Sequence, residues 1–374
     1  MILLSLLITA ILYSLCSLFY LYQTKKNIPL KKEEEIYLKN LQNLLKNEEI
    51  DPNSKDENGN FLLKLAAVEG DYHSTKLLLK YGADPDLQDN ECHTALTYAI
   101  ANNHLETVKI LLEYGANPNF TSPDVLTIPL CIAINRKNNI IIEALLKHKA
   151  DPNLRFTQNK ITPLMYAIEE NNYDAVKLLM QYGADPNIKE KHGSFALIGA
   201  EDPMIAKLLL EKGANANLKN DDDLTALFTT AYKNKVEIAK LLIQHNAIIN
   251  TQTKDGETPL MAATNKDNTE MIKLLLAHGA NPNVQRDDGN TALLFTRDPK
   301  TAKILLENGA DPNIQNIHGH NALILAAITG SLEIARLCLN WKIDITATDK
   351  EGKTAIEQAK DHNYPEIIQL LENI

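Results

Sequence analysis

The chain has 374 residues, with 38 Lys and Arg against 48 Asp and Glu, so its formal net charge is −10 at pH 7. Nucleic-acid binding depends on basic patches that displace counterions, and this acidic balance argues against it. The four cysteines are scattered and form no CxxC pair, so we expect neither a disulfide framework nor a zinc site.

Residues 1–22 form an apolar run without a charged side chain. At a rise of about 1.5 Å per residue, a helix of this length can cross the hydrocarbon core of a bilayer. No Lys or Arg precedes the run, and it ends in large side chains, so an uncleaved transmembrane anchor fits better than a signal helix. Secretion or another extracytoplasmic location after signal cleavage is the alternative.

Residues 23–32 form a short tether that carries Lys25, Lys26, Lys31 and Lys32. Because positive charge favours the cytoplasmic side of a membrane, we expect a single-pass protein whose remaining chain is cytoplasmic. Residues 33–50 are predicted to be a capping half-repeat, with a helix over 33–47 whose leucines lie on one face. Such a cap would cover the first apolar face of a repeat array.

From residue 51 onward, one pattern recurs: an apolar helix end, a turn residue, a polar connection and a Thr that can cap the next helix. The residue that follows each helix stop stands at positions 51, 84, 117, 151, 185, 215, 248, 281, 311 and 344, a period of about 33. A constant period of this length indicates stacked repeats. We predict an array over 51–374 with repeats at about 51–83, 84–116, 117–150, 151–184, 185–214, 215–247, 248–280, 281–310, 311–343 and 344–374.

The repeated residues resemble the ankyrin pattern. The clearest copy has Gly256-Glu257-Thr258-Pro259-Leu260, then Ala262-Ala263, then Leu275 through Asn283. The resemblance implies an all-α ankyrin-repeat solenoid, with a helix-turn-helix and a β-hairpin in each repeat, behind one N-terminal transmembrane or signal helix. It also implies a concave groove that binds a partner protein.

Two departures from the family pattern stand out. The repeats at 185–214 and 281–310 are short, and their junctions read 199–203 GAEDP and 296–299 TRDP. We expect each to lose about one turn of its inner helix, and we hypothesise that this notches the groove. The family's histidine after the Thr-Pro-Leu run is absent from every repeat, so apolar packing is expected to replace most of its hydrogen bonds between repeats.

No catalytic, metal or cofactor site is predicted. The sequence has no Gly-rich phosphate loop, nucleophile elbow or Cys/His pair. His148, His245 and His278 recur in the turn after an outer helix, which the repeat itself explains. We therefore do not expect an enzyme.

The candidate partner-binding residues lie in two apolar connections and beside them. The first connection contains Phe120, Val125 and Leu126, and the second contains Phe156. Tyr98, Ile132 and Tyr166 share one position of the inner helix that can face the groove. Aromatic clusters are typical interface hot spots. Alternatively, these side chains cover the core of longer loops. If they are exposed, Phe120→Ala with Phe156→Ala should weaken partner binding and leave thermal stability nearly unchanged.

We therefore predict a monomeric, membrane-tethered and non-catalytic scaffold for protein–protein interaction, attached through residues 1–22. One alternative is an exported or host-directed effector that captures a foreign protein. Another is the regulatory or targeting subunit of an enzyme complex.

Overall fold

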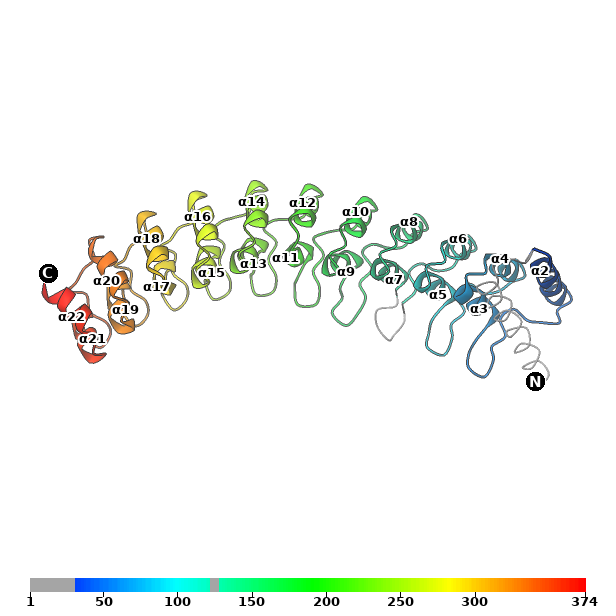
Figure 1. Cartoon of the computed structure of the whole chain (residues 1–374), viewed down its shortest axis with the longest axis horizontal. Helices are drawn as coiled ribbons and strands as arrows, with labels where there is room; N and C mark the ends of the chain where they lie inside the picture. The colour runs from blue at the N-terminus through cyan, green and yellow to red at the C-terminus, as the bar shows by residue number, and fades with distance from the viewer. Residues whose placement is uncertain (1–30, 122–127) are drawn as a thin grey trace. The chain divides into compact units, whose positions relative to one another are not determined.

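The computed structural model describes residues 31–121 and 128–374. It separates into unit 1, which extends to Lys191, and unit 2, which begins at His192. Within each unit, short helices follow one another in pairs (Figure 1). The predicted anchor at 1–22 and nearly all of the tether lie outside the described residues. Across 31–121 and 128–374, no helix is both long and apolar enough to span a membrane.

Unit 1 begins with a longer helix and continues with four helix pairs. Its helices are α2 Lys31–Lys46, α3 Leu62–Glu69, α4 Tyr72–Lys80, α5 Ala95–Ala101, α6 Leu105–Glu113, α7 Pro129–Asn135, α8 Asn139–Lys147, α9 Pro163–Glu169 and α10 Tyr173–Gln181. The helix predicted over 33–47 is thus present as α2, and it starts two residues earlier.

Unit 2 consists of helix pairs only. Its helices are α11 Ala196–Gly199, α12 Pro203–Glu211, α13 Ala226–Tyr232, α14 Val236–Gln244, α15 Pro259–Asn265, α16 Thr269–Ala277, α17 Ala292–Phe295, α18 Pro299–Glu307, α19 Ala322–Thr329, α20 Leu332–Leu339, α21 Ala355–Asp361 and α22 Pro365–Glu372. The predicted shortening of two inner helices is confirmed, because α11 and α17 have only four residues each. Asp202 and Asp298 cap the outer helices that follow.

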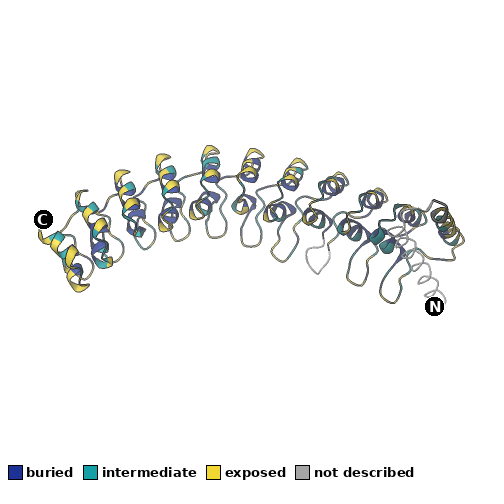
Figure 2. Ribbon diagram, viewed as in Figure 1, coloured by how far each residue is buried: buried dark blue, intermediate teal, exposed yellow. Residues whose placement is uncertain are grey.

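Neighbouring repeats form the core of each unit. An inner helix such as α5 packs on its own outer helix α6 and on the inner helices α3 and α7, while α2 packs on α4. The buried sides of the helices face these neighbours, and the exposed sides face away (Figure 2). Each helix pair buries its apolar side against the next pair, so the core forms only when repeats stack. The all-α repeat arrangement predicted from the sequence is therefore confirmed.

Most described helix pairs end in a left-handed residue, as the repeated Gly and Asn predict. Asn103, Asn171 and Asn234 have φ of 61°, 48° and 55° in the turns between inner and outer helices. Lys149 and Lys342 replace the usual Gly after an outer helix, and both also have positive φ, at 67° and 50°. These two lysines adopt a conformation that a side chain disfavours.

The connections between repeats correct one expectation. We expected β-hairpins, but the described residues contain isolated antiparallel bridges, such as that of Gln88 with Thr94, and no regular strand. The reason is local. Asp89 Oδ1 accepts hydrogen bonds from the backbone N–H groups of Glu91 and His93, at 3.0 and 2.9 Å. This tight turn leaves too few flanking residues to form a ladder.

A ladder of asparagine side chains joins successive repeats. Asn153 Oδ1 accepts from the N–H of Asp185 at 2.7 Å, and its Nδ2 donates to the carbonyl of Gly183 at 3.0 Å. The same two bonds recur at Asn53, Asn119, Asn217, Asn250, Asn283 and Asn313. The turns therefore supply hydrogen bonds between repeats. We had expected fewer such bonds, because the family's histidine is absent.

Candidate protein-binding surface

One position of the inner helices carries a half-buried apolar side chain throughout the described repeats of unit 1. It lies four residues after the N-cap of each helix and is occupied by Leu65, Tyr98, Ile132 and Tyr166, which we call the unit-1 row. The four helices pack side by side, so these residues follow one another across the unit. Three of them are predicted partner-binding residues. Leu65 occupies the same position and was not among the predicted residues.

Tyr98 is held in place by a buried carboxylate. Its hydroxyl donates to Asp89 Oδ2 at 2.6 Å, and Lys64 Nζ donates to the same oxygen at 2.7 Å. The Lys64 ammonium lies 4.9 Å from the centre of the Tyr98 ring. The His93 and Tyr98 rings pack edge to face, with their centroids 5.6 Å apart. Because the Tyr98 hydroxyl is already bonded, the exposed part of this side chain offers mainly ring surface.

Tyr166 is fixed in a similar way from the neighbouring repeat. Asn135 Nδ2 lies 3.2 Å from its hydroxyl, and the Phe156 ring packs edge-on at 6.3 Å between centroids. Next to it, partial burial and the carboxylates of Glu190 and Glu170 raise the pKa of Glu169. This end of the unit-1 row is therefore electrostatically suited to a cation.

Only part of the predicted aromatic surface is accessible to a partner. Phe156 is 6% exposed, so it belongs to the core and not to a free tip. The reason is that its backbone pairs with Ile161, which directs the ring inward onto Tyr166. Phe120 is half-buried, while Val125 and Leu126 lie outside the described residues. Of the predicted set, Tyr98, Ile132 and Tyr166 form the coherent surface.

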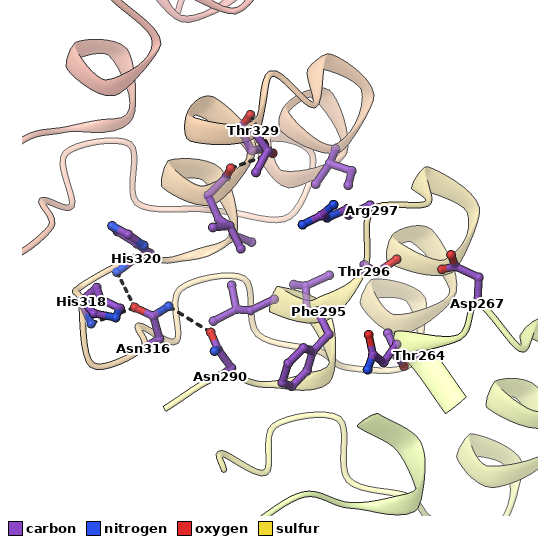
Figure 3. Close-up of a pocket in the computed structure, with 17 residues that line it drawn as sticks. Thr264, Asp267, Asn290, Phe295, Thr296, Arg297, Asn316, His318, His320 and Thr329 are labelled. Carbon is purple, nitrogen blue, oxygen red and sulfur yellow. Dashed lines mark hydrogen bonds between the residues drawn. The ribbon is translucent and has the colours of Figure 1, made fainter. Parts of the chain in front are cut away.

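Unit 2 has a different surface at the same helix position. Gly199, Thr229 and Ala262 make it small, and Phe295 and Leu325 then make it apolar again. Beside Phe295 the structure has a hollow of about 630 Å³, lined by residues of three successive repeats. The hollow lies where α17 ends one turn early (Figure 3). The second short repeat therefore has a hollow where its inner helix is shortened, and the notch in the groove stays a hypothesis.

The His and Cys side chains that the sequence singled out can now be located. Across 31–121 and 128–374, no group of three or more His, Cys, Asp or Glu could hold a metal ion. The rings of His148 and His278 instead bond to the carbonyls of Ala144 and Leu274 at the ends of their own helices. Cys131 and Cys338 are buried, and burial raises the pKa of both thiols.

The family model of ankyrin repeats, which describes three copies, matches four stretches of the chain: 34–122, 123–190, 195–286 and 290–373. A search of curated proteins found no significant match. Among solved structures, the ankyrin repeat domain of Bcl-3, described as a unique member of the IkappaB protein family, is similar with a TM-score of 0.52. It is 23% identical, and the match covers 57% of this chain and 100% of that one, which supports the fold alone. Since the family model matches most of the chain, the protein belongs to the ankyrin repeat family.

Proposed function

We propose that the protein is a non-catalytic scaffold that binds a partner protein along the unit-1 row. The observation that carries the proposal is the recurrence of half-buried apolar side chains at one position of adjacent helices. Two of them are tyrosines whose hydroxyls are bonded within the protein, so their rings are preorganised for contact. Large, rigid aromatic side chains contribute strongly to binding at a low entropic cost.

Site-specific crosslinking tests this function. A photoreactive residue at Ile132, in the middle of the unit-1 row, should crosslink the full chain to a discrete partner in its native cell. The matched control is Ile140 on α8, which is 61% exposed but lies outside the row. We expect Ile132 and not Ile140 to give the partner adduct in mass spectrometry. Equal yields at both positions would refute the unit-1 row as the binding surface.

The membrane tether is a second part of the proposal. Its support is the uncharged apolar run at 1–22, followed by four lysines within the next ten residues. The full chain should remain in membranes during alkaline extraction, and deletion of residues 1–22 should release it. Protease added to sealed cells should leave the repeats intact if they are cytoplasmic. Recovery of a mature chain that begins after the apolar run would instead identify a cleaved signal.

A further inference from the structure

The hollow in unit 2 is a consequence of the short helix α17. The helix stops at Phe295, and Thr296 is already extended, with ψ of 141°. The inner helices on both sides, α15 and α19, continue for three or four further residues. The missing turn therefore leaves space between two longer neighbours, and that space is open to residues of all three repeats.

The hollow is lined by polar and apolar side chains, and we call the apolar part of this lining its floor. Phe295 and Leu325, both half-buried, form it together with the small side chains Ala322 and Ala326. The Arg286 guanidinium lies over the Phe295 ring, and its carbon is 5.4 Å from the ring centre. A floor of this kind can desolvate an aliphatic side chain supplied by a partner.

The rim carries a cation without a partner. Arg297 follows the short helix, is exposed, and has no ion pair or hydrogen bond within the described chain. In Figure 3 its guanidinium extends over the hollow toward the side of Thr329. Lys233 and Arg286 in the same unit are, by contrast, already paired with Glu201 and Asp288.

The remaining rim groups favour one orientation of a bound segment. Asp267 lies on the opposite side of Thr296 from the two histidines (Figure 3), and burial and the Asp298 carboxylate raise its pKa. A carboxylate of the partner is therefore disfavoured next to Asp267. On the other side, burial lowers the pKa of His320, so its ring is neutral near pH 7 and can hydrogen-bond to a peptide.

We infer that this hollow binds an acidic segment of a partner protein, which places an aliphatic side chain on Phe295 and Leu325 and an adjacent carboxylate on Arg297. The inference rests on the proposed protein-binding function and adds the chemistry of the bound segment. A continuous segment suits the site because its walls come from three successive repeats. A guanidinium pairs with a carboxylate through two parallel N–H···O bonds, which gives the contact both direction and strength.

Labelled peptides test the inference on the full chain in detergent. The peptides share a central leucine and differ only in its flanking residues, which are glutamate, glutamine or lysine. The glutamate peptide should bind about tenfold more tightly than the glutamine peptide, and the lysine peptide should bind most weakly. Replacing the central leucine with glycine should weaken the glutamate peptide by a similar factor, because the apolar floor then has no occupant.

Two protein variants locate the charge preference. Arg297→Gln should abolish the advantage of glutamate over glutamine. Lys303→Gln is the matched control, because it removes the same charge from an exposed position of α18 whose ammonium faces Glu307. It should leave the preference intact.

Several results would overturn the inference: no binding of any peptide, a preference for lysine, an unchanged preference in Arg297→Gln, or equal binding when glycine replaces leucine. Crosslinking at Ile132 in unit 1 does not depend on these peptides. Failure of the peptides with successful crosslinking would therefore refute only the acidic-segment assignment, and the reverse result would refute only the unit-1 row.

Discussion

At the scale of a single residue, Asp89 shows how one carboxylate joins two repeats. It accepts from Lys64 of α3 and from Tyr98 of α5, and its side chain is only 2% exposed. Burial raises the pKa of Asp89, but the hydrogen bonds from Lys64, Tyr98 and the N–H of His93 outweigh burial and hold the pKa at about 2. The ionised form is therefore the one that the fold stabilises.

This gives a prediction about acid stability. A carboxyl group with a depressed pKa stabilises the fold above its unfolded value of 3.8, and the contribution disappears as the pH falls toward about 2. Asp89→Asn should therefore lower the free energy of unfolding by about 2 kcal/mol at pH 7. The variant should then lose less stability than the native chain between about pH 4 and pH 2. Urea unfolding at a series of pH values measures this, and parallel profiles would contradict it.

Phe156 gives a second prediction at this scale. Because the ring is buried against Tyr166, Phe156→Ala should cost about 3–5 kcal/mol of stability through lost transfer energy and a cavity. Phe120→Ala, at a half-buried position of the preceding connection, should cost less. Thermal unfolding of the two single variants separates them. An unchanged melting temperature for Phe156→Ala would mean that the ring is not part of the core.

At the scale of an element, the turns join successive repeats through side-chain hydrogen bonds. In the asparagine ladder, one side chain satisfies a carbonyl and an N–H of the same turn after an outer helix, as Asn153 does for Gly183 and Asp185. The turn before Asn117 departs from this pattern. There Asp86 accepts from the Asn117 N–H at 2.7 Å and, as a carboxylate, has no hydrogen to donate.

The ladder can be tested in both directions. Asn153→Ala removes two hydrogen bonds and should cost about 1–3 kcal/mol, while Asn153→Asp keeps the acceptor and should cost less. Asp86→Asn supplies the donor that this turn lacks and should stabilise the chain by about 0.5–1 kcal/mol. Urea midpoints measure all three variants. If Asn153→Ala were as stable as the native chain, the ladder would have no energetic role.

At the scale of the molecule, each unit is a row in which the main contacts of a helix are with nearby helices. The main contacts of α2 are with α4, and those of α3 are with α4 and α5. Stability in such arrays is a sum of repeat terms and nearest-neighbour terms, so a defect should weaken its neighbours first.

Hydrogen exchange can show this within unit 1. Leu41 and Leu45 are the buried ones among the described side chains of α2, and replacing both with Ala should loosen its contact with the first repeat. We expect faster amide exchange in α3 and α4 and little change in α9 and α10. Uniform acceleration through the unit would instead indicate a single cooperative core.

The sequence by itself determined the features that depend on local chemistry. The period of about 33 residues, the left-handed Asn103 and the early end of α17 all follow from residue type and spacing. Only the tertiary structure decided that Phe156 is core, that Asn153 joins two repeats, and that Arg297 stands unpaired beside a hollow with a partly apolar lining. The physical reason is that these properties depend on which side chains the neighbouring repeat brings within a few ångströms, and a local pattern does not contain that information.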